Sequence, residues 1–453
     1  MIAKEKLIEY TLFSDLSKDE YLMNLITDLG IKNIYDCASQ CNRCGYCYQH
    51  CPSYLVREQE SFSGRGRNQL IKMLVEQRLS LKKDSMHIQN VFSTCLLCAG
   101  CMSACYGKVP THKNVIEAKR SLIKKTVSKN TAFILNMLLN KPKQFRRQLK
   151  KLNFYRAVGL LKILQKTKFL NFLGRRLPEK INSYLGKPVF KFFTDGAKKH
   201  PVLSANKNKE PKCLYFISCT ANFIHPEIAD ATINLAEKFI GTVKMPSNMC
   251  CGVLNFNYLG LKDVKKHAEK IISLYENISD DKNIPIVTDC SSCAAHLKNF
   301  PELFLSDDDL HKRALAFSSR IKDISEIIDK NKLKPSQKLK NKTVTYHHSS
   351  CAYHKQGLNP IELVKIISNN NFSELTESTI ACGGELGFNF RNSDMAEILL
   401  KRKVSHIADT QSDFIATSDG FSLAFIEYGL KRYYPLTRIK HLSNLMWDAY
   451  KDD

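Results

Sequence analysis

The spacing of apolar residues predicts helices over most of the N-terminal half of the chain. An apolar pattern with the period of a helix, ended by Gly30, predicts helix over residues 1–36. This pattern consists of Leu22, Leu25, Ile26 and Leu29. A second helix, introduced by two glycines, is expected around Asn68–Leu79. Helical spacing resumes after Pro110, with a break expected near Pro142.

After Lys212 the pattern changes to short β-rich runs that alternate with amphipathic stretches. The expected strands are Leu214–Ile217, Ile284–Val287, Val344–Tyr346 and Phe414–Ala416. Amphipathic stretches at Glu227–Phe239 and Asp263–Tyr275 are expected to form helices. Strand–helix alternation of this kind favours α/β units on mostly parallel sheets.

The α/β half contains an internal repeat, which indicates a duplicated unit. Cys219 stands 32 positions before Cys251, and Cys351 stands 31 positions before Cys382. Each second cysteine opens a turn, in Cys250-Cys-Gly252 and in Ala381-Cys-Gly-Gly384. A polar, Lys-rich connector at residues 331–342 separates the two units.

The composition limits the classes of protein that the chain can represent. There is no apolar run of membrane-spanning length and no apolar signal segment after Met1, so we expect a cytoplasmic protein. The chain has 17 cysteines among 453 residues, and without an export signal a disulfide framework fits poorly. Cysteine spacings of two and three residues indicate metal ligation instead.

Two cysteine runs near the N-terminus repeat one spacing, namely Cys41-x2-Cys44-x2-Cys47-x3-Cys51 and Cys95-x2-Cys98-x2-Cys101-x3-Cys105. Three thiolates at such intervals bind three irons of one cubane [4Fe–4S] cluster, while the fourth thiolate reaches the other cluster. The predicted sets are therefore Cys41, Cys44, Cys47 and Cys105 for one cluster, and Cys95, Cys98, Cys101 and Cys51 for the other. Zinc or free thiols are the alternative. Cys37 fits no ligand position and is expected to be buried or spare.

A second group of cysteines belongs to the first α/β unit and consists of Cys219, Cys250, Cys251, Cys290 and Cys293. Strand ends should bring Cys219 and Cys290 to one edge of the sheet, where α/β folds gather ligands. Five thiolates at one edge suggest a further metal centre. The alternatives are a zinc site that uses four of them, or a redox pair at Cys290 and Cys293.

The second α/β unit lacks most of these residues. It keeps Cys351 and Cys382, but Ala381 replaces the first of the adjacent pair, and Thr417–Gly420 stands in place of Cys-x2-Cys. Two thiols cannot hold a cluster alone, so we expect no metal in this unit. The histidines near Cys351, which are His347, His348 and His354, could donate protons or contact a quinone, or could be ordinary loop histidines.

These motifs resemble a known group of proteins, in which a two-cluster ferredoxin domain is fused to duplicated CCG (cysteine-rich) domains. The group includes the glycolate oxidase iron–sulfur subunit, the lactate-utilisation iron–sulfur protein, and the corresponding iron–sulfur subunits of anaerobic glycerol-3-phosphate dehydrogenase and heterodisulfide reductase. Besides both cysteine runs, the resemblance is carried by Ser63-Gly-Arg-Gly-Arg67, Cys250-Cys-Gly-Val-Leu254, Cys290-Ser-Ser-Cys-Ala-Ala-His-Leu297, Asp323-Ile-Ser-Glu326 and Ala381-Cys-Gly-Gly384.

The stretch from Cys250 to Glu326 looks most like the glycolate oxidase protein of this group. The resemblance implies that a flavin-containing dehydrogenase subunit oxidises a 2-hydroxy acid, glycolate or lactate, and that this chain passes the electrons to membrane quinone. The chain shows no glycine-rich dinucleotide fingerprint, so the flavin should belong to a partner subunit.

Two other functions remain open. The five-cysteine set is similar to that of heterodisulfide reductase, whose CCG domain holds a noncubane [4Fe–4S] cluster, and this implies a catalytic disulfide reductase. The degenerate second unit departs from that pattern. A third hypothesis is a non-catalytic scaffold whose α/β half only docks partners.

Most of the net charge of +24 lies in one segment between the two halves of the chain. From Lys119 to His200 there are 22 Lys or Arg residues and two acidic residues, Glu179 and Asp195. A basic amphipathic helix could lie on the inner face of the cell membrane, as a peripheral attachment, or could be a solvated linker. No nucleic-acid-binding module accompanies the charge, so we expect no nucleic acid partner.

The patterns together predict a multidomain α and α/β protein with four parts. Residues 1–118 form a helical ferredoxin-like domain, and residues 119–205 form the basic helical segment. Residues 206–335 form the first CCG α/β unit, which holds the five-cysteine set. Residues 336–453 form the second, degenerate CCG unit.

Overall fold

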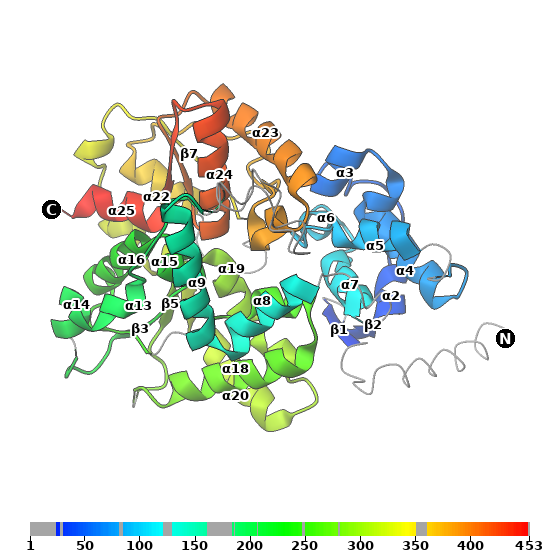
Figure 1. The fold of residues 1–453 in the computed structure, drawn as a ribbon, viewed down its shortest axis with the longest axis horizontal. Helices are drawn as coiled ribbons and strands as arrows, with labels where there is room; N and C mark the ends of the chain where they lie inside the picture. The colour runs from blue at the N-terminus through cyan, green and yellow to red at the C-terminus, as the bar shows by residue number, and fades with distance from the viewer. Residues whose placement is uncertain are drawn as a thin grey trace.

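The computed structural model describes residues 24–27, 30–80, 85–120, 129–160, 184, 186–205, 207–246, 250–279, 281–349 and 360–451. The N-terminal residues predicted as helix up to position 23, and the predicted site residues Cys351 and His354, lie outside these ranges. Figure 1 shows a helical N-terminal part at one end of the molecule and the two α/β units at the other.

The described chain begins with strands, so the helix predicted for this region is wrong over residues 24–27 and 30–33. Strand β1 (Asn24–Thr27) pairs antiparallel with β2 (Gly30–Asn33), with Ile26 opposite Ile31. A short apolar run fits either a helix or a strand by spacing alone, and the β-branched residues of this run suit a strand. Hydrogen bonding between β1 and β2, rather than the helical spacing of the apolar residues, therefore decides the structure here.

The two cysteine runs lie among short helices, which are α2 (Ile34–Ser39), α3 (Pro52–Arg57), η3 (Glu60–Phe62), α4 (Gly64–Val75), α5 (Ser85–Ser93), α6 (Gly100–Ser103) and α7 (Thr111–Ala118). The helix predicted at residues 68–79 is α4, which starts earlier because Ser63 Oγ accepts a hydrogen bond from Gly66 N at 2.9 Å. Side chains of α4, α5 and α7 form one core around Ile71, Phe92 and Val115. Cys37 on α2 is buried, as predicted.

The first α/β unit is built on a four-stranded parallel sheet in the order β4-β3-β5-β6. Its strands are β3 (Cys213–Phe216), β4 (Val243–Lys244), β5 (Ile286–Thr288) and β6 (Ile321–Asp323). Its helices are α15 (Cys219–Phe223), α16 (Pro226–Phe239), α17 (Val253–Tyr258), α18 (Leu261–Glu276), α19 (Ser291–Lys298), η6 (Phe300–Leu303), α20 (Asp308–Ser319) and α21 (Ile324–Ile327). Tyr215 packs on the α16 side of the sheet and Phe216 on the α18 side, so both faces of β3 are covered.

The second α/β unit repeats this plan with a parallel sheet in the order β7-β8-β9. Its strands are β7 (Val344–Tyr346), β8 (Phe414–Thr417) and β9 (Arg438–His441). Its helices are α22 (Pro360–Ile367), η10 (Glu385–Phe390), α23 (Ser393–Asp409), α24 (Gly420–Tyr433) and α25 (Leu442–Tyr450). The predicted α/β class with mostly parallel sheets is confirmed. The connector between the units carries the short 3-10 helices η7 (Lys330–Lys332) and η8 (Gln337–Leu339).

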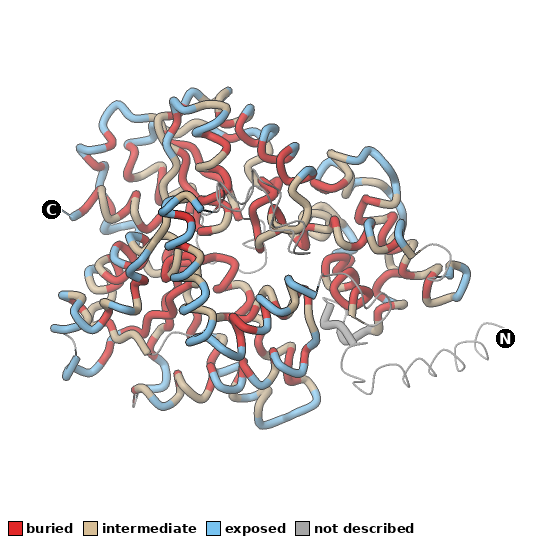
Figure 2. The backbone as a smooth tube through the Cα atoms, viewed as in Figure 1, coloured by how far each residue is buried: buried red, intermediate tan, exposed pale blue. Residues whose placement is uncertain are grey.

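The basic segment contains α8 (Lys129–Asn140) and α9 (Pro142–Ala157), so the predicted break at Pro142 is present. It is followed by α13 (Phe193–Gly196), η5 (Ala197–Lys199) and α14 (Pro201–Ala205). Helix α8 buries Leu135 and Leu139. Helix α9 is largely exposed, as Figure 2 shows. Among the described helices, none has the length and apolar character needed to cross a membrane.

The three parts pack directly against each other. Helix α16 of the first unit lies along α25 of the second, where Thr232 Oγ1 donates to Ser443 Oγ at 2.8 Å. Helix α3 contacts α23 of the second unit, as Figure 1 shows, and Leu96 shares a core with Cys382. The second cysteine run therefore lies beside the second α/β unit.

The close approach of the two units at Gly420 can be tested by substitution. A Cβ atom on Gly420 would lie 2.2 Å from Thr220 Oγ1, so Gly420→Ala should destabilise the protein by about 1–3 kcal/mol through overpacking. Thermal unfolding of the anaerobically purified protein, followed by circular dichroism, should show a lower midpoint. Gly260→Ala is the control, because no heavy atom lies within 4 Å of its Cβ position. Equal midpoints for the two variants would contradict this close approach.

Candidate metal centres

The two N-terminal cysteine runs follow the same backbone path. In the first run Arg43 and Gly45 have φ values of 55° and 86°, and the matching residues of the second run, Leu97 and Ala99, have 56° and 55°. A left-handed backbone is uncommon for residues other than glycine. Its repetition at matching positions curls each run into a concave segment of backbone N–H groups, a form that iron–sulfur sites use.

Cys51 of the first run lies with the cysteines of the second run. Burial raises the pKa of the Cys98 and Cys101 thiols, and the negative charge of Cys51 adds to this effect. The buried guanidinium of Arg67 reaches the same place, with Nη1 donating to Cys51 Sγ at 3.8 Å. This placement agrees with the prediction that the fourth cysteine of each run binds the cluster of the other run. The ligand assignment itself stays a prediction.

The cysteines of the first run lie close to Cys105 and to the start of α4. Cys44 and Cys105 line the same cavity. Cys47 Sγ and Cys101 Sγ both lie 3.5 Å from the position that a Cβ atom on Gly64 would take. Burial raises the pKa of Cys47 to about 11, which indicates a thiol withdrawn from water.

These eight thiols suit [4Fe–4S] clusters by their chemistry. Thiolates are the ligands that such clusters take, four to each cubane. Burial favours the protonated form of Cys47, Cys98 and Cys101 as long as no metal is bound. Bound iron would replace those protons, and the clusters would supply one-electron transfer.

The structure brings the five cysteines of the first α/β unit into one hydrogen-bonded chain. In spatial order the chain is Cys219, Cys250, Cys251, Cys293 and Cys290. One link of it is a hydrogen bond from Cys293 Sγ to Cys251 Sγ at 3.3 Å. Cys219 follows β3 and Cys290 follows β5, so the thiols gather at the carboxyl edge of the sheet. Their role as ligands stays a prediction.

Cys250 is the acceptor in this chain of thiols. Hydrogen bonds from Cys219 and Cys251 lower the pKa of Cys250 well below its ordinary value, despite burial. Gly252 N also donates to Cys250 Sγ, at 3.4 Å. A half-buried sulfur atom that accepts hydrogen bonds from neighbouring thiols and from a backbone N–H is a ready ligand for a thiophilic metal.

Two buried histidines beside Cys250 were missed in the sequence analysis. His267 Nε2 donates to the Cys250 carbonyl at 2.6 Å. Burial lowers the pKa of His296 to about 3, and its Nε2 has no hydrogen-bond partner among the described residues. The available signal was the spacing of Cys293 and His296 on α19, since residues three apart share a helix face.

The second α/β unit contributes Asp419 to this centre. Asp419 Oδ2 accepts hydrogen bonds from Ser292 Oγ at 2.7 Å and from Cys290 Sγ at 3.6 Å. Cys290 and Asp419 occupy matching positions, because each is the N-cap residue of a helix that follows a central strand of its unit, β5 or β8. Asp419–Ser422, rather than the predicted Thr417–Gly420, therefore stands in place of Cys-x2-Cys, and Asp419 contacts its counterpart Cys290.

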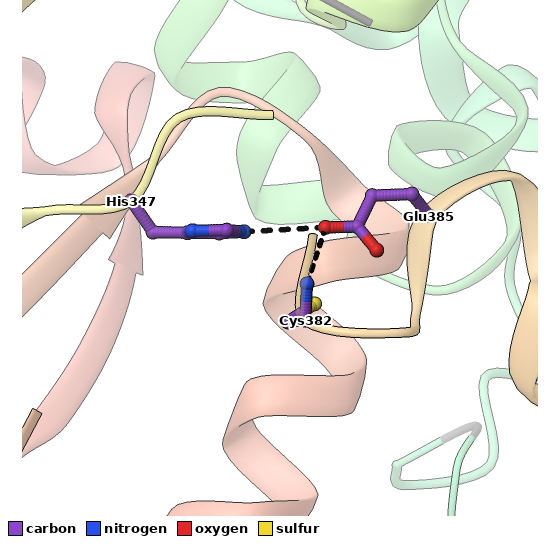
Figure 3. A group of neighbouring side chains, drawn as sticks. All are labelled: His347, Cys382 and Glu385. Carbon is purple, nitrogen blue, oxygen red and sulfur yellow. Dashed lines mark hydrogen bonds and ion pairs between the residues drawn. The ribbon is translucent and has the colours of Figure 1, made fainter. Parts of the chain in front are cut away.

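In the second unit, Cys382 is buried beside His347 and Glu385 (Figure 3). The neighbouring His348 does not join them, and its ring packs edge-on against Tyr346 at a centroid distance of 5.0 Å. The acidic residue was not among the site residues predicted from the sequence.

The fit around the two N-terminal thiol sets can be tested at Gly64. A Cβ atom there would lie 2.8 Å from Cys101 Cβ, so Gly64→Ala should displace Cys101 and lower the bound iron by at least about half. Iron and acid-labile sulfide of the anaerobically purified variant provide the measurement. Gly107→Ala is the control, because its Cβ position lies 3.9 Å from Cys105 Sγ. Full iron content in Gly64→Ala would contradict the convergence of Cys47 and Cys101 at this glycine.

Comparison with known families agrees with these groupings. The family described as "4Fe-4S dicluster domain" matches residues 37–109. The family described as "Cysteine-rich domain", CCG, matches twice, over residues 213–298 and 344–427. The three matches cover both cysteine runs and the core of each α/β unit.

Several curated proteins are similar along much of the chain. The probable glycolate oxidase iron-sulfur subunit of Bacillus subtilis is 24% identical over 425 residues, which cover 90% of this chain and 93% of the relative. The glycolate oxidase iron-sulfur subunit of Escherichia coli is 22% identical, with 84% of this chain and 87% of the relative covered. Lactate utilization protein A of Shouchella clausii is 25% identical over 51% of this chain and 96% of the relative.

The resemblance inferred from the cysteine motifs is confirmed by these matches, and iron–sulfur clusters are the cofactors that the matched domains support. The chain belongs to the family of iron–sulfur oxidoreductase subunits in which a 4Fe-4S dicluster domain is joined to two cysteine-rich CCG domains, the family of the glycolate oxidase iron–sulfur subunits.

Proposed function

We propose that this chain is the electron-transfer subunit of a flavin-dependent 2-hydroxy-acid oxidase or dehydrogenase that acts on glycolate or lactate. In this proposal the eight N-terminal cysteines hold two [4Fe–4S] clusters, and the five-cysteine set holds a third, noncubane [4Fe–4S] cluster. Bound clusters carry single electrons, here from the flavin of a partner subunit toward quinone.

The observation that carries the proposal is the convergence of five thiols at the carboxyl edge of the first sheet. A chain with two cubanes alone would need none of them. Their close approach, with a hydrogen bond from Cys293 Sγ to Cys251 Sγ and one from Gly252 N to Cys250 Sγ, gives a preformed donor set for one more cluster. The glycolate oxidase and lactate utilization names of the relatives supply the substrate class.

Two features of the five-cysteine set also support the disulfide-reductase alternative. The lowered pKa of Cys250 and the presence of five thiols, where four would hold a cubane, suit a centre that also binds a sulfur substrate. The contact from Asp419 closes the Cys290 side of this centre. A heterodisulfide reductase-like reaction therefore remains the second candidate function.

Attachment to the membrane surface is proposed for α9. The helix and its C-cap expose Phe154 and Val158, with 55% and 56% of their surface accessible, among Lys and Arg residues. Apolar side chains that enter the headgroup region, together with cations that face anionic lipid, would hold the clusters close to quinone.

Metal content and spectroscopy test the number of clusters. Anaerobically purified protein should contain about twelve iron atoms per chain, as three four-iron clusters require, and should give a third EPR signal besides those of two cubanes. About eight iron atoms would reduce the chain to a two-cluster relay and would remove both the third cluster and the disulfide-reductase alternative.

Substitution of Cys250 assigns the third signal to the five-cysteine set. Cys250→Ala should lose that signal and about four iron atoms while both cubane signals persist. Cys213→Ala is the matched control, because Cys213 is buried on β3 but belongs to neither set. Loss of the third signal in Cys213→Ala as well would show a folding defect rather than a lost ligand. An unchanged signal in Cys250→Ala would reject the assignment.

Vesicle binding tests the membrane attachment of α9. Wild-type protein should co-sediment with vesicles that contain anionic phosphatidylserine, and Phe154→Ser should bind at least about tenfold more weakly because a large apolar side chain no longer enters the interface. Ile398→Ser on α23 is the control, since Ile398 is 52% exposed on another element. Equal binding by both variants, or no binding by the wild type, would exclude this mode of attachment.

A further inference from the structure

A buried site with three different ligand types lies in the second α/β unit, outside both cysteine sets. His347 follows β7, Cys382 lies on the segment that leads into η10, and Glu385 begins η10. One ligand atom from each side chain lies within 4.8 Å of the other two, and all three residues are 0% exposed (Figure 3).

The hydrogen bonds of His347 fix which ring nitrogen carries its proton. Nδ1 lies 3.1 Å from the carbonyl oxygen of Ser378, which can only accept, so Nδ1 carries the hydrogen. In a neutral imidazole Nε2 is then an acceptor. It faces Glu385 Oε1 at 3.3 Å, and a carboxylate oxygen is an acceptor too. Two buried acceptors at this distance require a proton or a metal ion between them.

Backbone groups hold the carboxylate of Glu385 in place. Its Oε1 accepts a hydrogen bond from Cys382 N at 2.8 Å, and its Oε2 accepts one from Gly383 N at 2.9 Å. Each carboxylate oxygen keeps a further lone pair, so Oε1 can still bind a metal ion beside His347 Nε2.

We propose that His347, Cys382 and Glu385 bind a divalent transition-metal ion, with Zn²⁺ as the preferred occupant. Imidazole nitrogen, thiolate sulfur and carboxylate oxygen are all zinc ligands, whereas Ca²⁺ and Mg²⁺ avoid sulfur. One thiolate and one carboxylate neutralise Zn²⁺, so the buried complex carries no net charge. The bond from Nδ1 to a backbone carbonyl is the arrangement that zinc-binding histidines usually have.

Lys403 is the competing cation at this site. It is buried on α23, and its ammonium donates to the carbonyl oxygen of Glu377. Burial lowers the pKa of Lys403 to about 8, while Cys382 and Glu385 attract its positive charge. Without metal it balances the charge of Glu385. Zinc binding displaces the Cys382 proton and is therefore expected to tighten as the pH rises toward 8.

The proposed metal site differs from the sequence-based expectation that the second unit binds no metal. That expectation considered Cys351 and Cys382 only and could not place Glu385 beside a histidine. Since Leu96 packs in the same core as Cys382, a bound ion would fix the segment that supports the second cysteine run. The site uses none of the thirteen cysteines assigned to iron, so it stands independently of the proposed function.

Elemental analysis of the full-length protein, purified anaerobically with zinc in the growth medium and then dialysed, tests the proposal. We expect about one zinc atom per chain. X-ray absorption at the zinc edge should show one sulfur neighbour together with nitrogen and oxygen neighbours. His347→Gln and Glu385→Gln should each lower the zinc content at least about tenfold and leave the iron content unchanged.

His348→Gln is the matched control, because this adjacent histidine packs against Tyr346 rather than at the site. It should keep both zinc and iron. A zinc environment of three or four sulfur atoms would place the ion in the five-cysteine set and overturn the proposal. Protein without zinc, or zinc retained in both His347→Gln and Glu385→Gln, would also overturn it. Wild-type protein that holds zinc with one sulfur neighbour but lacks iron would support this site and contradict the proposed function.

Discussion

The mutual repulsion of buried thiolates is the constraint on which the rest of the structure depends. Water would screen such charges, but most of the thirteen cysteines are wholly or partly withdrawn from it. The chain offsets the repulsion with fixed dipoles and cations. The backbone N–H groups of Arg65 and Gly100 hydrogen-bond to Cys47 and Cys98, and the buried guanidinium of Arg67 lies against Cys51. Short helices help to offset the repulsion, because each helix N-terminus presents backbone N–H groups without partners inside the helix.

The sequence predicted best where chemistry imposes a spacing. The two N-terminal runs, the duplication and the strands β3, β5, β7 and β8 all follow from local patterns. Strands β4, β6 and β9 were missed because each is short and contains charged residues, so none shows an unbroken apolar run. The hairpin at residues 24–33 was taken for a helix, since pairing between its strands decides its form and leaves no trace in the spacing.

Three of the site residues that were not predicted contact a partner from another part of the chain. Asp419 meets Cys290 across the boundary between the units, and Glu385 meets His347 across the sheet edge. His267 reaches the Cys250 carbonyl from the long helix α18. A single sequence shows which residues can ligate or donate, but only the packing of the units shows which of them meet. Cysteine runs on a single loop are the exception, because their spacing along the backbone already brings the ligands together.

The contact between Cys290 and Asp419 has a consequence for how the two halves can diverge. A duplicated unit is normally free to change, and the second half lacks most of the cysteines of the first. Its surface beside the first half is still constrained, because Asp419, at the position that matches Cys290, contacts Cys290 and Ser292 of the neighbouring centre. The second α/β unit therefore forms part of the site in the first unit. Separating the two units would open that site to water.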